Sequence, residues 1–141
     1  MSERPKVDKE YIEQCSDGWI KKIENLYSLV KETLKNNNEV QCYTNQSVTM
    51  HEGLMIEHHV LPKQVPILDL FVRNQLKATF KPIGLWVVGA NGRVDILTSQ
   101  GAYILVDVGE DEITPHWKVF SPKNRKNSVP FDVAFIVKLV Q

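Results

Sequence analysis

The sequence lacks most of the features that mark secreted, membrane-spanning and nucleic-acid-binding proteins. Its two cysteines, Cys15 and Cys42, are too few for a disulfide-stapled secreted domain, so we expect two reduced thiols. No apolar run approaches the roughly 18 to 20 residues that a membrane span requires, and the first residues form no apolar leader. Seventeen basic and seventeen acidic residues leave a formal net charge of zero. We therefore predict a soluble cytoplasmic protein with no membrane partner, and the charge balance argues against nucleic acid as a partner.

The common enzyme motifs are missing as well. The 141 residues contain no phosphate-binding Walker loop, no glycine-rich dinucleotide fingerprint, no nucleophile elbow, and neither a Cys-X-X-Cys nor a His-Glu-X-X-His pattern. We expect no cofactor, and this absence favours a protein that is not an enzyme.

The N-terminal quarter of the chain has the pattern of one amphipathic helix. Ile12, Trp19 and Leu26 recur at seven-residue steps, with further apolar residues on the same face. Asp8 or Asp17 is a suitable N-cap, and the three asparagines at 36–38 are suitable for a helix end. Gly18 is a position at which the helix could divide into a short and a longer piece. We predict a helix over residues 8–35, within a helical segment 1–36.

From residue 39 onward, β-branched and aromatic residues dominate, and turn residues interrupt them at short intervals. This pattern predicts strands, at residues 40–44, 48–51, 54–60, 67–72, 76–81, 85–89, 93–98, 102–108, 116–120 and 131–140. The predicted fold class is α+β. A single domain, 1–141, has its N-terminal amphipathic helix packed on a twisted, mostly antiparallel sheet formed by residues 39–141, which is either open or curled into a partial barrel.

The strongest local turn signal is the Asn91-Gly92 pair. It suits a type I′ turn, and it predicts a hairpin between residues 85–89 and 93–98. A three-residue loop at 99–101 would then place Ile96 opposite Ile104 and Arg93 opposite Asp107.

Both faces of this predicted three-stranded meander are apolar. One carries Leu85, Val87, Val94, Ile96, Ile104 and Val106, and the other carries Trp86, Val88, Leu97, Tyr103 and Leu105. One helix can cover only one face, so the second face needs the late strands, a second copy of the chain, or a ligand. We expect Trp86, Leu97, Tyr103 and Leu105 to form an interaction face. The leading functional hypothesis is a non-enzymatic protein-interaction domain of the inhibitor or immunity type, which forms a homodimer or binds another protein.

An alternative function uses the histidines and the strand carboxylates. His51, Glu57, His58 and His59 are candidate metal ligands. They would support a small metal-dependent or acid-base hydrolase together with Asp95, Asp107 and the acidic residues 110–112. Adjacent histidines on a strand point to opposite faces, so we expect these histidines to be surface residues and to hold no metal.

A short basic stretch lies near the C-terminus. Lys118, Lys123, Arg125 and Lys126 accompany Trp117 and Phe120, a composition that single-strand binders use. The patch is short in a neutral chain, so we interpret residues 121–128 as a solvated loop.

Overall fold

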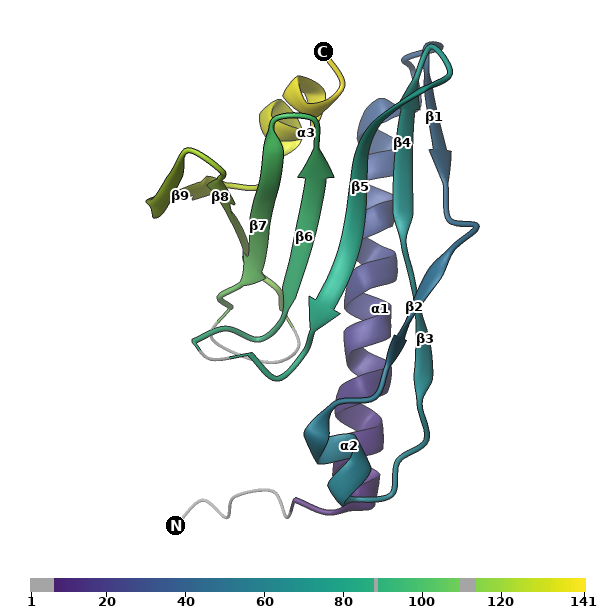
Figure 1. Cartoon of the computed structure of the whole chain (residues 1–141), viewed down its shortest axis with the longest axis vertical. Helices are drawn as coiled ribbons and strands as arrows, with labels where there is room; N and C mark the ends of the chain where they lie inside the picture. The colour runs from purple at the N-terminus through teal and green to yellow at the C-terminus, as the bar shows by residue number, and fades with distance from the viewer. Residues whose placement is uncertain (1–6, 88, 110–113) are drawn as a thin grey trace.

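The computed structural model describes residues 7–87, 89–109 and 114–141. It confirms the α+β class, with a long N-terminal helix on one face of a large antiparallel sheet (Figure 1). The elements are, in chain order, α1 (Lys9–Leu34), β1 (Val40–Tyr43), β2 (Ser47–Met50), α2 (Gly53–Glu57), β3 (Lys63–Pro66), β4 (Leu68–Val72), β5 (Gln75–Gly84), β6 (Arg93–Thr98), β7 (Gly101–Asp107), β8 (Trp117–Ser121), β9 (Asn124–Pro130) and α3 (Val133–Leu139).

Helix α1 begins and ends where the sequence predicts. The Asp8 side chain accepts a hydrogen bond of 2.9 Å from the backbone N–H of Tyr11, which satisfies one of the free donors of the first turn. The helix runs through Gly18 without a break and buries one face from Ile12 to Leu34. In the described part of the chain, no helix is both long enough and apolar enough to cross a membrane.

Seven strands form one open sheet in the order β1-β4-β5-β6-β7-β8-β9, and every neighbouring pair is antiparallel. The two ends of this order, β1 and β9, do not pair with each other, so the sheet does not close into a barrel. Strands β2 and β3 form a separate two-stranded sheet beside the N-terminal half of α1 (Figure 1).

The type I′ hairpin turn occurs at a different place from the predicted one. Arg73 and Asn74 have φ angles of 50° and 66°, and they join β4 to β5 through a two-residue loop. At the predicted site, Asn91 and Gly92 bond to the backbone of Asp107, and β6 pairs with β5. The strand predicted at 85–89 is therefore wrong: the described residues there form a loop, and Val88 lies outside the described residues. The ten-residue β5 provides the longer partner for β6.

The register between β6 and β7 differs from the prediction by one residue. The connecting loop has two residues instead of three, so Ile96 lies opposite Tyr103 and Arg93 lies opposite Val106. Because alternate residues of a strand face opposite sides, this shift exchanges the two faces of β7. Leu105 joins the core at 0% exposure, and Ile104 faces the other side of the sheet.

Two other predicted strands contain helices, and two observed strands were not predicted. Residues 54–60 include most of α2, and residues 131–140 include α3, whose N-cap Asp132 accepts a 3.0 Å hydrogen bond from the N–H of Phe135. The strands missing from the prediction are β3 and β9, and β9 lies largely in the stretch predicted as a loop. Apolar runs of five to seven residues do not distinguish a short helix from a strand.

The core lies between the sheet and the two helices α1 and α3, which cover the same face of the sheet (Figure 1). On this covered face Phe80 forms edge-to-face contacts with Tyr27 of α1 and with Phe131. The sheet residues with 0 to 1% exposure include Leu68, Leu70, Ala78, Phe80, Val94, Ile96, Leu105 and Val119.

Candidate functional site

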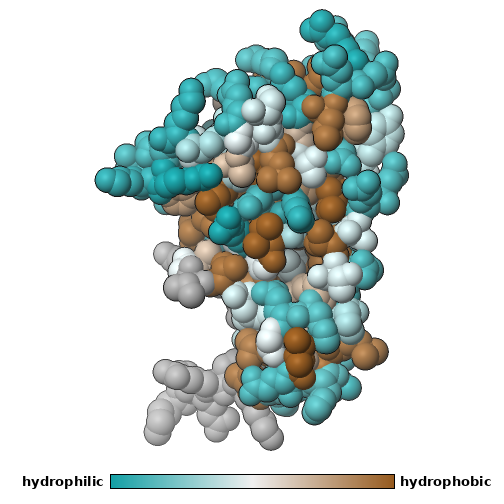
Figure 2. Space-filling model, in the orientation of Figure 1, coloured by the Kyte–Doolittle hydropathy of each residue, from teal (hydrophilic) through white to brown (hydrophobic). Residues whose placement is uncertain are grey.

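The opposite side of strands β5–β8 has no helix over it in the described part of the chain. The register places five apolar side chains there, and we call this surface the open face: Leu97, Ala102, Ile104, Val106 and Phe120. Leu97 is 42% exposed, and the other four are half-buried by their neighbours. Figure 2 looks onto this side of the molecule and shows hydrophobic patches between hydrophilic ones.

Charged residues of both signs surround the open face. Arg93 donates two hydrogen bonds to the carboxylate of Asp95, at 2.8 and 3.2 Å. Lys81 lies opposite Asp95 on the neighbouring strand, and Lys118 lies opposite Val106. The predicted pairing of Arg93 with Asp107 is wrong, because the one-residue shift of register places Val106 opposite Arg93.

The four residues predicted as an interaction face do not share one surface. Leu97 is on the open face, but Leu105 is fully buried on the covered face. Tyr103 is also on the covered face, where its ring lies 5.5 Å from that of Phe135. Trp86 belongs to the loop after β5. The predicted face was wrong because the register is shifted and residues 85–89 do not form a strand. Of the four predicted residues, Leu97 is the one that a partner could reach on the open face.

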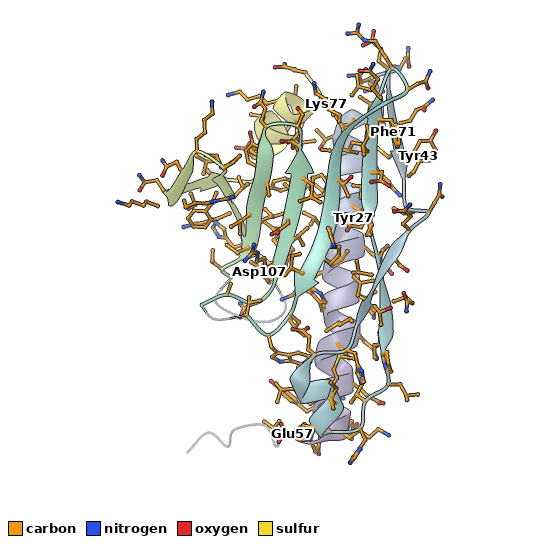
Figure 3. The ribbon with its side chains drawn as sticks, viewed as in Figure 1. Tyr27, Tyr43, Glu57, Phe71, Lys77 and Asp107 are labelled. Atoms are coloured by element: carbon orange, nitrogen blue, oxygen red, sulfur yellow. The ribbon has the colours of Figure 1, made fainter. Side chains whose placement is uncertain are left out.

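The covered face contains a buried ion pair between α1 and the end of β7. The ammonium of Lys22 lies 2.9 Å from Asp107 Oδ2, and the two side chains are 10% and 0% exposed. Asp107 Oδ1 accepts hydrogen bonds from the backbone N–H groups of Gly109 and His116, at 2.9 and 2.8 Å. Figure 3 labels Asp107 at the end of the sheet where the loops gather. The sequence feature that could have indicated this ion pair is Lys22, a lysine on the apolar face of α1, three residues after Trp19.

A cavity of about 560 Å³ lies between the N-terminal half of α1 and the loop that joins β5 to β6. Helix α1 contributes Tyr11, Gln14, Cys15, Gly18, Trp19 and Lys22, which lie on one side of the helix, and the loop contributes Leu85, Trp86, Val87, Ala90 and Asn91. The sequence did not predict this site. No sequence motif indicates the cavity, because it forms where a loop packs against a helix.

The carboxylate of Glu52 holds this loop in place. Its two oxygens accept hydrogen bonds from the backbone N–H groups of Leu85 and Trp86, at 3.0 and 3.3 Å. A Cβ on Gly84 would lie 2.9 Å from the same carboxylate, so glycine permits the close approach. Glu52 precedes α2, and it therefore ties the small sheet and α2 to the wall of the cavity.

The candidate metal ligands lie around α2. His51 precedes α2, Glu57 is its last residue, and His58 and His59 follow; His59 has a φ of 58°. Figure 3 places Glu57 at the end of the molecule beyond the sheet, away from Asp107. Among the described residues, no group of three or more His, Cys, Asp or Glu side chains could hold a metal ion.

The strand carboxylates are also separated. Asp95 is on the side of the open face, whereas Asp107 is buried on the covered face, so the sheet lies between them. Residues 110–112, the rest of the predicted acidic group, lie outside the described residues.

The basic residues near the C-terminus lie on a hairpin. Lys123, Arg125 and Lys126 are exposed at the turn and on β9, and Lys118 projects from β8. Strand β9 is an edge strand, and charges on an edge discourage pairing with another sheet.

Neither Cys15 nor Cys42 forms a disulfide among the described residues. Burial raises the pKa of the Cys42 thiol, although nearby Lys31 opposes the shift, so Cys42 is less reactive than an exposed thiol. Cys15 lines the cavity. The molecule thus offers two candidate surfaces, the open face and the cavity beside α1. No protein-family model, curated protein or solved structure matches the chain.

Proposed function

We propose that this chain is a non-enzymatic protein-interaction domain, and that its open face binds a second copy of the chain. The supporting observation is the set of apolar side chains on β6, β7 and β8 that no element of the described chain covers. A sheet with one face in water normally carries polar residues on that face.

The apolar part of the open face is continuous. Leu97 pairs with Ala102 across β6 and β7, and Ile104 pairs with Phe120 across β7 and β8. Burying apolar surface contributes roughly 25 cal/mol per Å². A partner that covers these side chains would remove from water the apolar surface that α1 and α3 leave exposed.

The charges around the open face favour a second copy over a partner of one charge sign. A two-fold interface uses the same patch twice, so the patch must be self-complementary. Lys81, Arg93 and Lys118 provide positive charge on this side of the sheet, and Asp69 and Asp95 provide negative charge. The formal net charge of zero also means that two copies do not repel each other at long range.

Sedimentation equilibrium over a range of protein concentrations tests this proposal. We expect the wild-type chain to approach twice its 16.2 kDa monomer mass. Leu97→Lys should leave a monomer, because the dimer would bury an unpaired charge. The matched control is Leu61→Lys, which changes a 79% exposed leucine away from the open face and should leave the dimer intact.

Two outcomes would contradict the proposal. One is a wild-type chain that stays monomeric at high concentration, which would leave a different protein as the occupant of the open face. The other is a dimer that Leu97→Lys does not weaken.

A further inference from the structure

We propose that the cavity between α1 and the loop after β5 binds an uncharged small molecule that contains an aromatic ring and one hydrogen-bond acceptor. The cavity is independent of the open face, since it lies beside α1. Its volume of about 560 Å³ falls within the range of roughly 300 to 1,000 Å³ that small-molecule sites occupy.

The walls favour a flat aromatic ligand. Tyr11 of α1 and Trp86 of the loop are half-buried and provide two aromatic side chains that a ligand could reach. Trp19 also lines the cavity, but it is 1% exposed and belongs to the core. The Trp19 ring is fixed in position, because it packs against Gly92 so closely that a Cβ there would lie 2.2 Å from the ring. The ring of Trp117 also lies near it, at 6.2 Å between ring centroids. Aromatic rings pack best against other rings in stacked or edge-to-face arrangements.

The charges favour an uncharged ligand. Lys22 is the one charged side chain among the described residues that line the cavity, and Asp107 already neutralises it at 2.9 Å. An anionic ligand would add a second negative charge beside a buried carboxylate. A cationic ligand would meet the ammonium of Lys22. In both cases the described part of the wall offers the added charge no counter-ion that is not already paired.

The polar groups on the wall favour a ligand with one acceptor. An ammonium has three N–H donors, and Asp107 takes one of those of Lys22 within the described structure. A carbonyl or ether oxygen could accept another. Asn91 is less free to bind a ligand, because its side-chain amide already donates a 2.8 Å hydrogen bond to the carbonyl of Gly109.

Hydrogen bonds within the chain hold the described walls of the cavity in place. Glu52 holds the backbone of Leu85 and Trp86, and Asn91 is held by its bonds to Gly109 and Asp107. A ligand therefore does not have to order the described parts of this wall, which lowers the free-energy cost of binding.

Fluorescence titration with prodan tests the proposal. Prodan is an uncharged naphthalene fluorophore with one ketone oxygen, and its emission shifts to the blue in apolar surroundings. The blocking variant is Gly18→Phe, because nothing lies within 4 Å of a Cβ at Gly18 and the new ring would occupy the cavity. Gly18→Ala is the matched control, since it changes the same helix position without filling the space.

We expect saturable binding of prodan to the wild-type chain. Gly18→Phe should weaken it by about tenfold or more, while Gly18→Ala should change it by less than about twofold. Trp86→Ala is a second variant, in which loss of a half-buried wall residue should weaken binding by about fivefold. Circular dichroism of each variant checks that the fold is retained.

Anilinonaphthalene sulfonate, an anionic fluorophore with a similar ring system, separates the ligand classes. We expect it to bind more weakly than prodan at any site that Gly18→Phe blocks. The proposal is overturned if wild-type protein does not bind prodan, if neither Gly18→Phe nor Trp86→Ala weakens binding, or if the anionic probe binds the blocked site as tightly as prodan.

Discussion

The two faces of strands β6 and β7 differ in packing far more than in composition. On the covered face, Val94, Ile96 and Leu105 are all 0% exposed. On the open face of the same strands, Leu97 is 42% exposed and Ile104 is half-buried. Apolar composition alone therefore does not decide which face becomes the core. The position of the helices decides it.

Aromatic residues at the start of α3 hold this helix on the same face of the sheet as α1. Phe131 packs on Phe80 at 6.2 Å between ring centroids, and Phe135 packs on Tyr103 at 5.5 Å. These contacts extend the cover that α1 provides toward β7. The C-terminal residues thus complete the covered face, and they leave the open face as it is.

Among the substitutions that distinguish the two faces, the largest loss of stability is expected at Lys22. Lys22→Met removes the partner of the buried Asp107 carboxylate and should lower the free energy of unfolding by about 3 to 5 kcal/mol. Lys81→Met, on the exposed side of β5, should change it by less than about 0.5 kcal/mol. Urea denaturation measures both. Similar losses at the two positions would show that the burial of the ion pair contributes little.

The second effect compares two isoleucines that lie on opposite faces of adjacent strands. Ile96→Ala should cost about 2 to 5 kcal/mol, because the side chain is fully buried. Ile104→Ala should cost less than about 1 kcal/mol in the monomer. Unfolding at two protein concentrations separates this loss from any effect on association. Equal losses would restore the register that the sequence predicted.

The third effect concerns the hydroxyl of Tyr27, which bonds to the backbone carbonyls of Pro66 and Phe80 at 2.7 and 3.1 Å. Tyr27→Phe should cost about 1 to 3 kcal/mol near neutral pH, since it leaves buried carbonyls without this donor. The tyrosine joins α1 to both sheets, so the loss measures how firmly the covered face is held.

The difference in stability between wild type and Tyr27→Phe should also depend on pH. Burial raises the pKa of Tyr27 above its ordinary value of 10.0. The unfolded chain then loses the proton before the folded chain does, so the stabilisation is complete below about pH 10 and is lost as the pH rises above it. We expect the advantage of wild type over Tyr27→Phe to shrink by about 1.4 kcal/mol per pH unit there. An advantage that stays constant between about pH 9 and pH 11 would contradict this assignment.

The smallest effect is expected where the covered face ends and the cavity begins. Gly18→Ala should raise the free energy of unfolding by about 1 kcal/mol, because alanine is the better helix residue and nothing lies within 4 Å of the new Cβ. Thermal unfolding measures this gain. A loss of stability would mean that the wall of the cavity stands closer to α1 than the structure places it.

The sequence predicted the parts of the fold that local chemistry determines. Asp8 caps α1 as expected, and the alternating apolar residues of β4 to β8 lie in strands. The sequence did not predict the hairpin turn at Arg73-Asn74, because arginine is an unusual residue at a positive φ. The register at 99–101 depended on a loop that is one residue shorter than predicted, and no residue in that loop distinguishes the two lengths.

The candidate surfaces depended on contacts between distant parts of the chain, which local patterns do not encode. The sequence predicted that a single helix would leave one sheet face without cover, but the residues assigned to each face depended on the register. The cavity requires Glu52 to hold a loop that begins 33 residues later. Glu52 was visible in the sequence as part of a histidine-rich stretch, and nothing in its neighbours indicates its role.

The ion pair between Lys22 and Asp107 also has a consequence for the kinetics of folding. The two residues are 85 positions apart, whereas the β4–β5 and β6–β7 hairpins close through two-residue loops. Closing a long loop costs more entropy than closing a short one, so we expect the hairpins to form early and the ion pair to form after the rate-limiting step. Loss of Lys22 should then speed unfolding and leave the folding rate nearly unchanged. The ion pair would therefore affect the half-life of the folded chain more than it affects the time that the chain takes to fold.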